Sequence, residues 1–466
     1  MRGFKGKLAI ILLACSWLLL FWLTGSRTPW RDVFAEQDGH ISISLGDVPV
    51  QQYHRMGFTS GIVRHNPHKN YWLVGTEQGN VLAVDMQGRI IWKRNFGIGK
   101  ITAMAFSRDE QRIYVGEQSP TGQVYALSAD NGDVLWRFSS ADGVGSEPSL
   151  RSNPTVTRIV VDTQDRVYFS AYRFQMNGKA KKDYFSKLYA LDKQANVLWQ
   201  YPPNKVMDSW VNWFDLADSY DTLAFSTCNY DLQDNMQYLQ NLYFLDTTTQ
   251  TIKREEYIQP LQPFKRTVMR SSPNYSADGK YLTGIASDGR GFLFDTQGNL
   301  IWQAAVASPR NLNGDWLNAI GRESMIVGQN VVFTTLNTFN RNNWQLSTPV
   351  EHPGDNSIFV FDLQGNFQHK YKAAGNIEDI NSTEQLLAAA IGRNVRLQTY
   401  QGHGAMLINL GERTEPQLYP TPGPLQSVAI SANRKFLAGI ETPAQTESGK
   451  IIGEYRLHIW EIEPNK

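Results

Sequence analysis

Short stretches in which apolar and polar residues alternate, separated by turns that contain glycine, recur along most of this chain. The clearest stretch covers residues 71–96 and predicts strands at 71–75, 81–85 and 90–94. The turns between these strands hold Gly79 and Gly88, which supply the positive φ that tight hairpins need. Three short strands cannot bury their own apolar face. The pattern therefore predicts a unit that is repeated elsewhere in the chain.

Eight such units align on the last residue of their third strand. These residues are Asp85, Ser128, Asp192, Asp246, Asp295, Asp362, Asn409 and Glu461. Their spacing of about 40 to 70 residues is the size of a four-stranded propeller blade. The sequence therefore predicts an all-β, eight-bladed β-propeller. The seventh unit has the weakest pattern, and without it the ring would have seven blades.

The ends of the units give further expectations. The eighth unit lacks an outer strand, and residues 40–45 alternate as a strand should, so we expect them to complete that blade and close the ring. The inner strands of the first and fifth units are expected at 58–63 and 268–272. The aligned acidic residues stand just before turns, and turn chemistry explains them better than catalysis does.

Composition agrees with an all-β body and narrows the classes of function. The chain has 466 residues, of which 12% are aromatic, and aromatic residues favour strands. A formal net charge of +1 gives no general attraction to nucleic acid. The two cysteines, Cys15 and Cys228, provide neither a disulfide framework nor a cysteine-based zinc site.

The N-terminus carries an apolar run at residues 8–23, preceded by Arg2, Lys5 and Lys7. With the next two residues this run would span roughly 27 Å as a helix, just enough for the core of a bilayer. The preceding basic residues favour a cytoplasmic N-terminus, with the propeller on the extracytoplasmic side, periplasmic or extracellular.

Three interpretations of this N-terminal segment remain open. We favour an uncleaved single-pass anchor, because the run is longer than most signal-peptide cores. A cleaved signal peptide, with a small-residue site at 33–35, and a lipoprotein signal at Cys15 are the alternatives. The expected organisation is an anchor or signal at 1–25, a tether at 26–39 and the propeller at 40–466.

Four units share a closer motif, in which an apolar third strand is followed by an outer strand with Trp at its third position. The motif occupies residues 79–92, 122–136, 188–199 and 291–302. It resembles the quinoprotein-like (PQQ-like) β-propeller repeat, and the inner strands near 270–276 and 427–431 resemble the WD40 style. Among family members the chain is similar to exported, non-enzymatic propellers such as the propeller lipoprotein of the β-barrel assembly machinery. The resemblance implies that the outer-strand tryptophans pack between neighbouring blades: Trp92, Trp136, Trp199 and Trp302.

Loop lengths suggest where a partner binds. The connections between second and third strands are long in five units, at residues 173–186, 228–241, 336–356, 391–404 and 441–455. These connections emerge on one face of a propeller, together with the links between blades, and one-sided insertions usually mark a binding face. Trp and Arg are typical interface anchors. The candidate interaction residues are Trp210, Trp344, Arg341, Lys181 and Asp208, whereas Trp213 and Trp316 are expected in the core.

The sequence favours a non-catalytic protein-interaction scaffold at the cell envelope, without cofactor, metal or nucleic acid. It would bind protein partners through the long-loop face and the membrane through its N-terminal helix. One alternative is a quinone-dependent dehydrogenase, which the resemblance would equip with calcium and a quinone over the axis; Asp208, Asp215 and Asp315 are the carboxylates expected there. Adjacent cysteines, which such enzymes often carry, are missing. Another alternative is a propeller that binds a glycan or small ligand in its central funnel. His65 and His68 are expected at the surface.

Overall fold

The computed structural model describes residues 39–55, 59–97, 99–146, 152–178, 181–228, 236–312, 314–340, 348, 350–396, 400–412 and 415–463, with the side chain of Lys181 left out. The segment predicted as an anchor lies outside these residues. By its internal contacts the chain divides into Met1–Ile41 and Ser42–Lys466. No helix among the described residues is long and apolar enough to cross a membrane.

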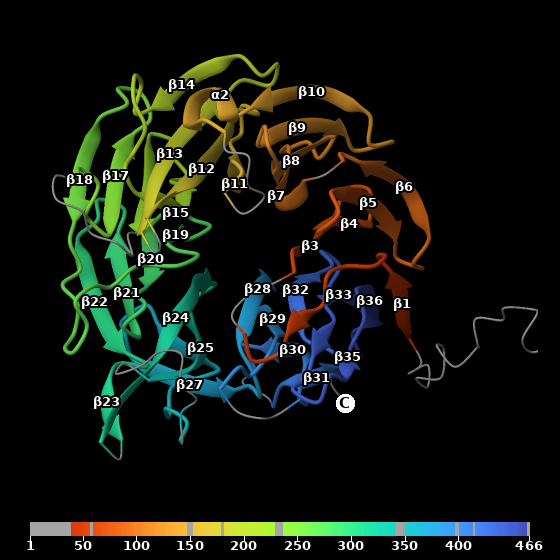
Figure 1. Cartoon of the computed structure of the whole chain (residues 1–466), viewed down its shortest axis with the longest axis vertical. Coiled ribbons are helices and arrows are strands. Elements are labelled where there is room, and N and C mark those ends of the chain that lie inside the picture. Colours follow the sequence, from red (N-terminus) through yellow and green to blue (C-terminus); the bar gives the residue numbers. More distant parts are fainter. Residues whose placement is uncertain are drawn as a thin grey trace, which may run out of the picture. The chain divides into compact units, whose positions relative to one another are not determined.

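The larger unit is an all-β, propeller-like fold in which sheets follow one another around a central axis (Figure 1). Within the described residues the single helix is the four-residue α2 (Ala141–Val144). The first sheet contains β3 (Gly61–Asn66), β4 (Tyr71–Thr76), β5 (Asn80–Asp85) and β6 (Ile90–Asn95). Each of these strands pairs with the next in antiparallel fashion, so the chain builds this sheet from the axis outward.

The next two groups of four strands are joined into one sheet. They are β7 (Lys100–Phe106), β8 (Arg112–Gln118), β9 (Gln123–Ser128) and β10 (Val134–Ser139), then β11 (Thr155–Val161), β12 (Val167–Asn177), β13 (Lys181–Leu191) and β14 (Val197–Tyr201). A single pair, Thr155 with Gln118, connects β11 to β8. Two separate four-stranded sheets follow. They contain β15 (Trp210–Leu216), β16 (Thr222–Cys228), β17 (Leu242–Asp246) and β18 (Ile252–Glu256), then β19 (Asn274–Tyr275), β20 (Tyr281–Ile285), β21 (Arg290–Asp295) and β22 (Leu300–Ala305).

The last third of the chain forms three larger sheets and one small one. The first holds β23 (Arg310–Leu312), β24 (Asp315–Val327), β25 (Asn330–Asn340), β26 (Ser357–Asp362) and β27 (Phe367–Lys372). The second holds β28 (Ile377–Thr383), β29 (Leu386–Ile391), β30 (Gly404–Asn409) and β31 (Gln417–Pro420). The third has the order β32 (Leu425–Ile430), β33 (Phe436–Glu441), β36 (Arg456–Glu461) and β1 (His40–Ser44), so strands from both ends of the chain share it. The small sheet contains β2 (Gln51–Gln52), β34 (Ala444–Gln445) and β35 (Ile451–Ile452).

Two inner strands differ from the sequence prediction. The first begins at Gly61 and extends to Asn66, instead of covering 58–63. The fifth is only Asn274–Tyr275, while residues 268–272 contribute a single bridge between Met269 and Ala286. Pro273 explains this second difference, because proline has no N–H to donate to a strand ladder and interrupts the expected strand.

The aligned acidic residues organise turns, as predicted. In the turn after β13, Asp192 Oδ1 accepts hydrogen bonds from the backbone N–H groups of Gln194 and Asn196 at 2.8 and 2.9 Å. The Asn196 amide also donates to this carboxylate and lowers the pKa of Asp192. Asp85, Asp246, Asp295 and Asp362 accept backbone N–H groups in the same way. These side chains therefore terminate strands through Asx turns.

The outer-strand tryptophans lie between neighbouring sheets, which confirms the structural role that the resemblance implied. Trp136 Nε1 donates to the carbonyl of Lys193 in the next group of four strands at 3.0 Å, and Trp302 Nε1 donates to the carbonyl of Leu363 in the next sheet. Trp92 covers Gly132, where a Cβ atom would lie 2.5 Å from the indole ring. Trp199 packs with Tyr168, Phe225 and their neighbours.

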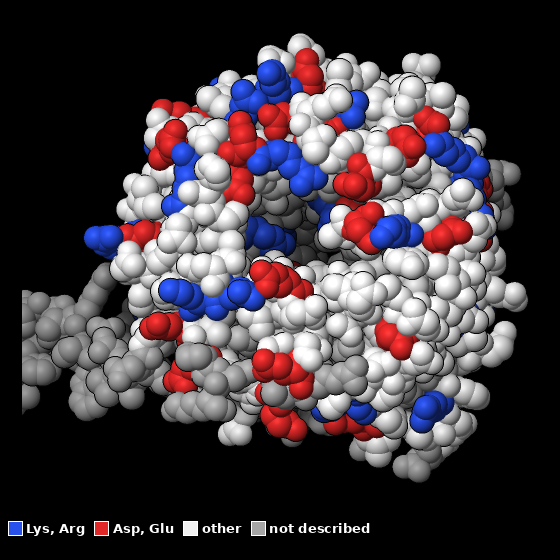
Figure 2. Space-filling model, turned by 180° about the vertical axis from the view of Figure 1, so that it is seen from behind, with Lys and Arg blue, Asp and Glu red and all other residues white. Residues whose placement is uncertain are grey.

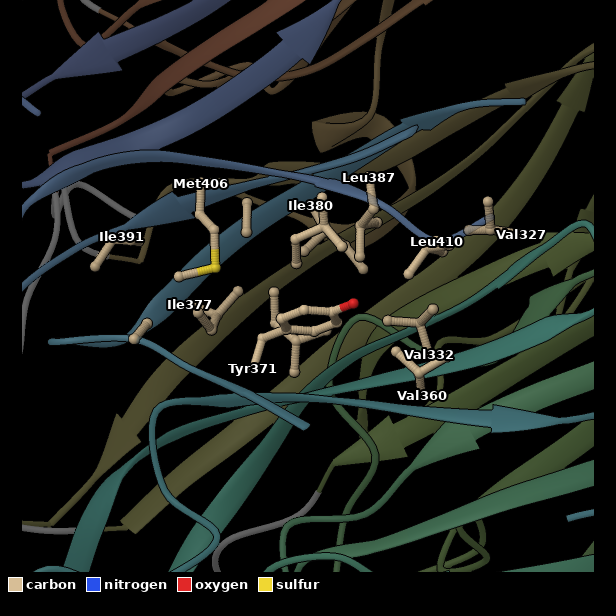
Figure 3. Close-up of a cluster of buried hydrophobic side chains, with 14 residues drawn as sticks. Val327, Val332, Val360, Tyr371, Ile377, Ile380, Leu387, Ile391, Met406 and Leu410 are labelled. Carbon is tan, nitrogen blue, oxygen red and sulfur yellow. The ribbon is translucent and has the colours of Figure 1, made fainter. Parts of the chain in front are cut away.

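The hydrophobic core is divided among the contacts between adjacent sheets. Figure 3 shows the cluster between the sheet that ends in β27 and the sheet β28–β31. Val332, Val360 and Tyr371 from the first sheet face Ile377, Met406 and their neighbours in the second. Successive side chains of a strand point to opposite faces, so Val360 packs in this cluster while its neighbour Phe359 packs in the cluster on the other side of the same sheet. The packing is consequently repeated from one sheet to the next around the ring.

Candidate functional site

The long connection predicted at residues 173–186 is a β-hairpin rather than a loop. Strands β12 and β13 stay paired without interruption from Val167 with Leu191 to Asn177 with Lys181. The outer strand β14 accompanies the hairpin only up to the pair Leu188–Tyr201. The outer half of the hairpin therefore projects beyond its sheet. The sequence held a signal for it, since Gly178 lies between two alternating segments.

One face of this projecting hairpin carries aromatic residues. Because side chains alternate along a strand, Tyr172, Phe174 and Tyr184 share a face, with Met176 beyond them. The ring centroids of Phe174 and Tyr184 are 6.3 Å apart. Met176 is 49% exposed. Tyr184 is buried and Phe174 half-buried, so this apolar face reaches solvent mainly at Met176, near the tip of the hairpin.

Trp210, the first residue of β15, extends this surface inward. Its ring centroid lies 5.1 Å from that of Tyr172 and 6.3 Å from that of Tyr184, to which it is nearly parallel. Its Nε1 is buried, with no hydrogen-bond partner among the described residues. We call Tyr172, Phe174, Met176, Tyr184 and Trp210 the aromatic stripe. Trp210, which was predicted as an interaction residue, lies at the half-buried inner end of this stripe.

Basic side chains lie over aromatic rings on both faces of the hairpin. The Lys182 ammonium is 4.4 Å from the centre of the Phe174 ring. On the opposite face the Arg173 guanidinium is 4.0 Å from the Phe185 ring, and its Nε donates to the Val144 carbonyl. Cations at such distances are attracted by the electron-rich face of the ring. The hairpin therefore presents both apolar area and positive charge.

The other predicted interaction residues have different outcomes. Asp208 accepts hydrogen bonds from the backbone N–H groups of Gln237 and Tyr238, so its carboxylate holds the loop after β16. Lys181 is at the tip of the hairpin, opposite Asn177. Trp344 and Arg341 lie outside the described residues. Thus Trp210 and Asp208, two residues apart, support the base of this surface, and Lys181 lies at its tip.

The predicted core and surface residues are placed as follows. Trp213 is half-buried on the inner strand β15, where its Nε1 donates to Asn274. Trp316 is 37% exposed, which corrects its assignment to the core, because it pairs with Asn311 of the short edge strand β23. His68 is exposed, whereas His65 is half-buried and accepts a hydrogen bond from the backbone N–H of Ala432.

The axis is lined by inner strands whose carboxylates bond to the neighbouring sheet. Figure 2 shows a hollow at the centre of the face, with charged side chains of both signs around it. Asp379 Oδ2 accepts hydrogen bonds from Ser427 Oγ at 2.7 Å and from the backbone N–H of Val428 at 3.1 Å. Asp215 likewise accepts the N–H of Tyr275 and pairs with Arg158 at 2.9 Å. These carboxylates therefore connect successive inner strands.

A third axial carboxylate, Glu323, accepts the backbone N–H of Ile380 at 3.0 Å. Burial, together with the nearby charge of Asp379, raises the pKa of Glu323 to about 7 against the opposing effect of Arg322. Among the described residues, no group of three or more His, Cys, Asp or Glu side chains is arranged to hold a metal. Of the three carboxylates expected at the axis, Asp208 instead holds the loop after β16, and Asp215 is paired with Arg158.

Two of the five long connections contact the N-terminal part of the chain. Strand β2 pairs with β34 in the connection at 441–455. Arg393, in the connection at 391–404, donates to the carbonyls of Gln52 and Arg55 at 2.9 and 3.0 Å. Tyr53 is 1% exposed and its OH bonds to His403 Nε2 at 2.8 Å. We call residues 51–55 the strap. This contact has no local signal in the sequence, because the residues that meet are more than 300 positions apart.

Comparison with known proteins supports the repeat. Residues 77–209 match the family model described as outer membrane protein assembly factor BamB. No curated protein matches the sequence. The solved β-propeller domain of Cps50 (Swd1) from Myceliophteria thermophila is 13% identical, with 88% of this chain and 98% of that one covered and a TM-score of 0.47. BamB from Moraxella catarrhalis is 13% identical, and the match covers 71% of this chain and 79% of that one with a TM-score of 0.42. The chain thus resembles the PQQ-like propeller family, with the BamB model matched over residues 77–209.

Proposed function

We propose that the protein is a non-catalytic interaction scaffold built on an eight-bladed propeller. In this proposal each group of four successive strands is one blade, and β1 supplies the outer strand of the last blade and closes the ring. The apolar run at 8–23 tethers the propeller to a membrane, with the body on the extracytoplasmic side. Protease treatment of sealed spheroplasts tests that orientation, since protection of the body until the cytoplasmic membrane is lysed would contradict it.

The observation that carries the interaction role is the aromatic stripe on the projecting hairpin. Strand β14 leaves the outer half of the hairpin uncovered, and Met176 at its outer end is half exposed. Aromatic side chains beside a basic residue are typical of interface anchors, since they combine large contact area with few rotatable bonds. The match to a BamB family model over residues 77–209, which include this hairpin, agrees with a partner-binding role.

A crosslinking pull-down with the full chain tests this role. The variant Phe174→Ser with Met176→Ser removes apolar area from the stripe. An interface anchor contributes about 2 kcal/mol, so the variant should bind the captured partner roughly 30-fold more weakly. The matched control is Tyr257→Ser, which changes a residue that is 59% exposed outside the stripe. Equal capture by the variant and the control would refute the stripe as the binding surface.

A further inference from the structure

Four outer strands expose an aliphatic pair at their first two positions. In β6, β10, β14 and β22 each of these side chains is between 46% and 52% exposed. The pairs are Ile90–Ile91, Val134–Leu135, Val197–Leu198 and Leu300–Ile301. Single exposed aliphatic residues are ordinary on protein surfaces, but a pair repeated at one structural position is not. We call these eight residues the apolar rim.

A β-bulge produces the exposure of each pair. In β10 the ladder passes from Val134 with Leu127 directly to Trp136 with Ala126, so Leu135 has no paired residue. The same shift occurs at the start of β6, β14 and β22. Because a bulge interrupts the alternation of side chains, two neighbours reach solvent while the following Trp turns towards the next sheet. The rim is therefore built into the ladder.

All four pairs lie at the same end of the sheets, and the chain enters the larger unit at that end. Leu45 N–H donates to the Tyr455 carbonyl, and Arg456 donates to Ser42 Oγ, so β1 runs antiparallel to β36. The start of β1 then lies beside the end of β36, where Glu461 pairs with Phe436. The same end of each sheet carries the turn that leads into the outer strand. In the second group, Ser128 at the end of β9 pairs with Arg112 just before the turn into β10.

The rim is interrupted on the far side of the proposed ring. In β18 the ladder passes from Ile252 with Leu245 to Arg254 with Phe244, which places Lys253 at the position of Leu135. Ile252 itself is only half-buried rather than exposed. This sheet is the fourth of eight groups and the β1 sheet is the eighth, so they stand opposite each other. Three of the pairs therefore lie in the groups that follow the entry point, and the fourth lies in the group after β18. Between that group and the entry point, β27 and β31 each carry one exposed apolar residue near their start, Phe367 and Leu418.

We propose that the apolar rim seats the propeller on the lipid surface from which its N-terminal tether emerges. The inference rests on the proposed tether. Residues 26–39 separate the apolar run from β1, and a flexible linker of this length has a mean reach of about 20 Å. The rim end of the body is thus held near the bilayer. Half-exposed aliphatic side chains with mixed charges around them suit the interface of a zwitterionic membrane.

The test uses the full chain with Cys15→Ser in phosphatidylcholine vesicles, with or without nitroxide-labelled lipid. An environment-sensitive dye is attached to one introduced cysteine, and Cys228 stays because it is fully buried. The reporter is Leu135→Cys. The matched controls are Lys253→Cys, at the equivalent position of β18, and Ser139→Cys, at the opposite end of β10.

We expect the dye at 135 to shift to shorter wavelength and to lose at least half of its emission to the nitroxide lipid, while the dyes at 139 and 253 change little. Adding Ile91→Asp and Leu198→Asp should reduce quenching at 135 at least twofold. A chain that floats with the vesicles but shows equal quenching at all three positions refutes the seat and leaves the tether intact. A chain that does not float refutes the tether and the seat together. If the wavelength shift increases with protein density and the nitroxide lipid does not quench the dye, the rim contacts a second copy of the chain, and the proposal is overturned.

Discussion

Removing the Asp379 carboxylate should loosen the ring at the axis, because this group connects two inner strands. Its Oδ2 accepts the Ser427 hydroxyl and the Val428 N–H, and Arg64 approaches it at 3.5 Å. Ser427 is 2% exposed and Val428 is fully buried. In Asp379→Ala the Ser427 hydroxyl and the Val428 N–H both lose their shared acceptor while they remain buried.

The magnitude follows from these contacts. A buried donor left without a partner costs about 1–3 kcal/mol, so two donors cost roughly 2–6 kcal/mol. The Arg64 pair adds less than about 1 kcal/mol, because the arginine side chain is 37% exposed. A chain of 466 residues unfolds with an entropy of about 1 kcal/mol/K, at ~2.1 cal/mol/K per residue. Asp379→Ala should therefore lower the melting temperature by about 2–7 °C.

Calorimetry of the wild-type protein, Asp379→Ala and Asp379→Asn at neutral pH measures this effect. The asparagine variant keeps an acceptor oxygen in place, so it should lose less than half as much stability as the alanine variant. A melting temperature for Asp379→Ala within 1 °C of wild type would refute the role of this carboxylate. Equal losses in both variants would show that charge, rather than hydrogen-bond acceptance, is what matters.

Three other changes test separate features. Burial raises the pKa of Glu323 to about 7, so the stability it contributes is present in full below its ordinary value near 4.5 and is lost as pH rises to 7; Glu323→Gln should flatten the pH profile of urea unfolding between pH 5 and 7. Gly132→Ala would place a Cβ atom 2.5 Å from the Trp92 ring and should cost at least about 1 kcal/mol more, in thermal unfolding, than Gly178→Ala, which meets open space at a similar φ. Arg393→Met removes the donor to the strap carbonyls, and limited proteolysis should then cleave residues 51–55 faster than in wild type while the sheets stay resistant.

Features set by neighbouring residues were predictable from the sequence. The alternation at 71–96 and the Asp before each turn depend on contacts within a few positions, and Asp85 and Asp192 act as the pattern indicates. Pro273 carried a local signal against the strand at 268–272. The alternation around Gly178 is typical of a hairpin, although residues 173–186 were interpreted as a long loop. Contacts between distant segments could not be read in this way. Nothing near Tyr53 in the sequence indicates that His403 will cover it.

The sheet that β1 shares with β36 also constrains when the protein can finish folding. Arg456 reaches Ser42 across 414 positions, so this contact forms only after almost the whole chain has been made. Contacts between such distant positions slow folding, because the chain must close a long loop before it gains them. Until then the open edge of β33 and the unpaired strand β1 are available to other strands. A chain that ends before Arg456 would leave the edge of β33 and strand β1 unpaired. The larger unit can therefore complete its sheets only when the last strand has been made.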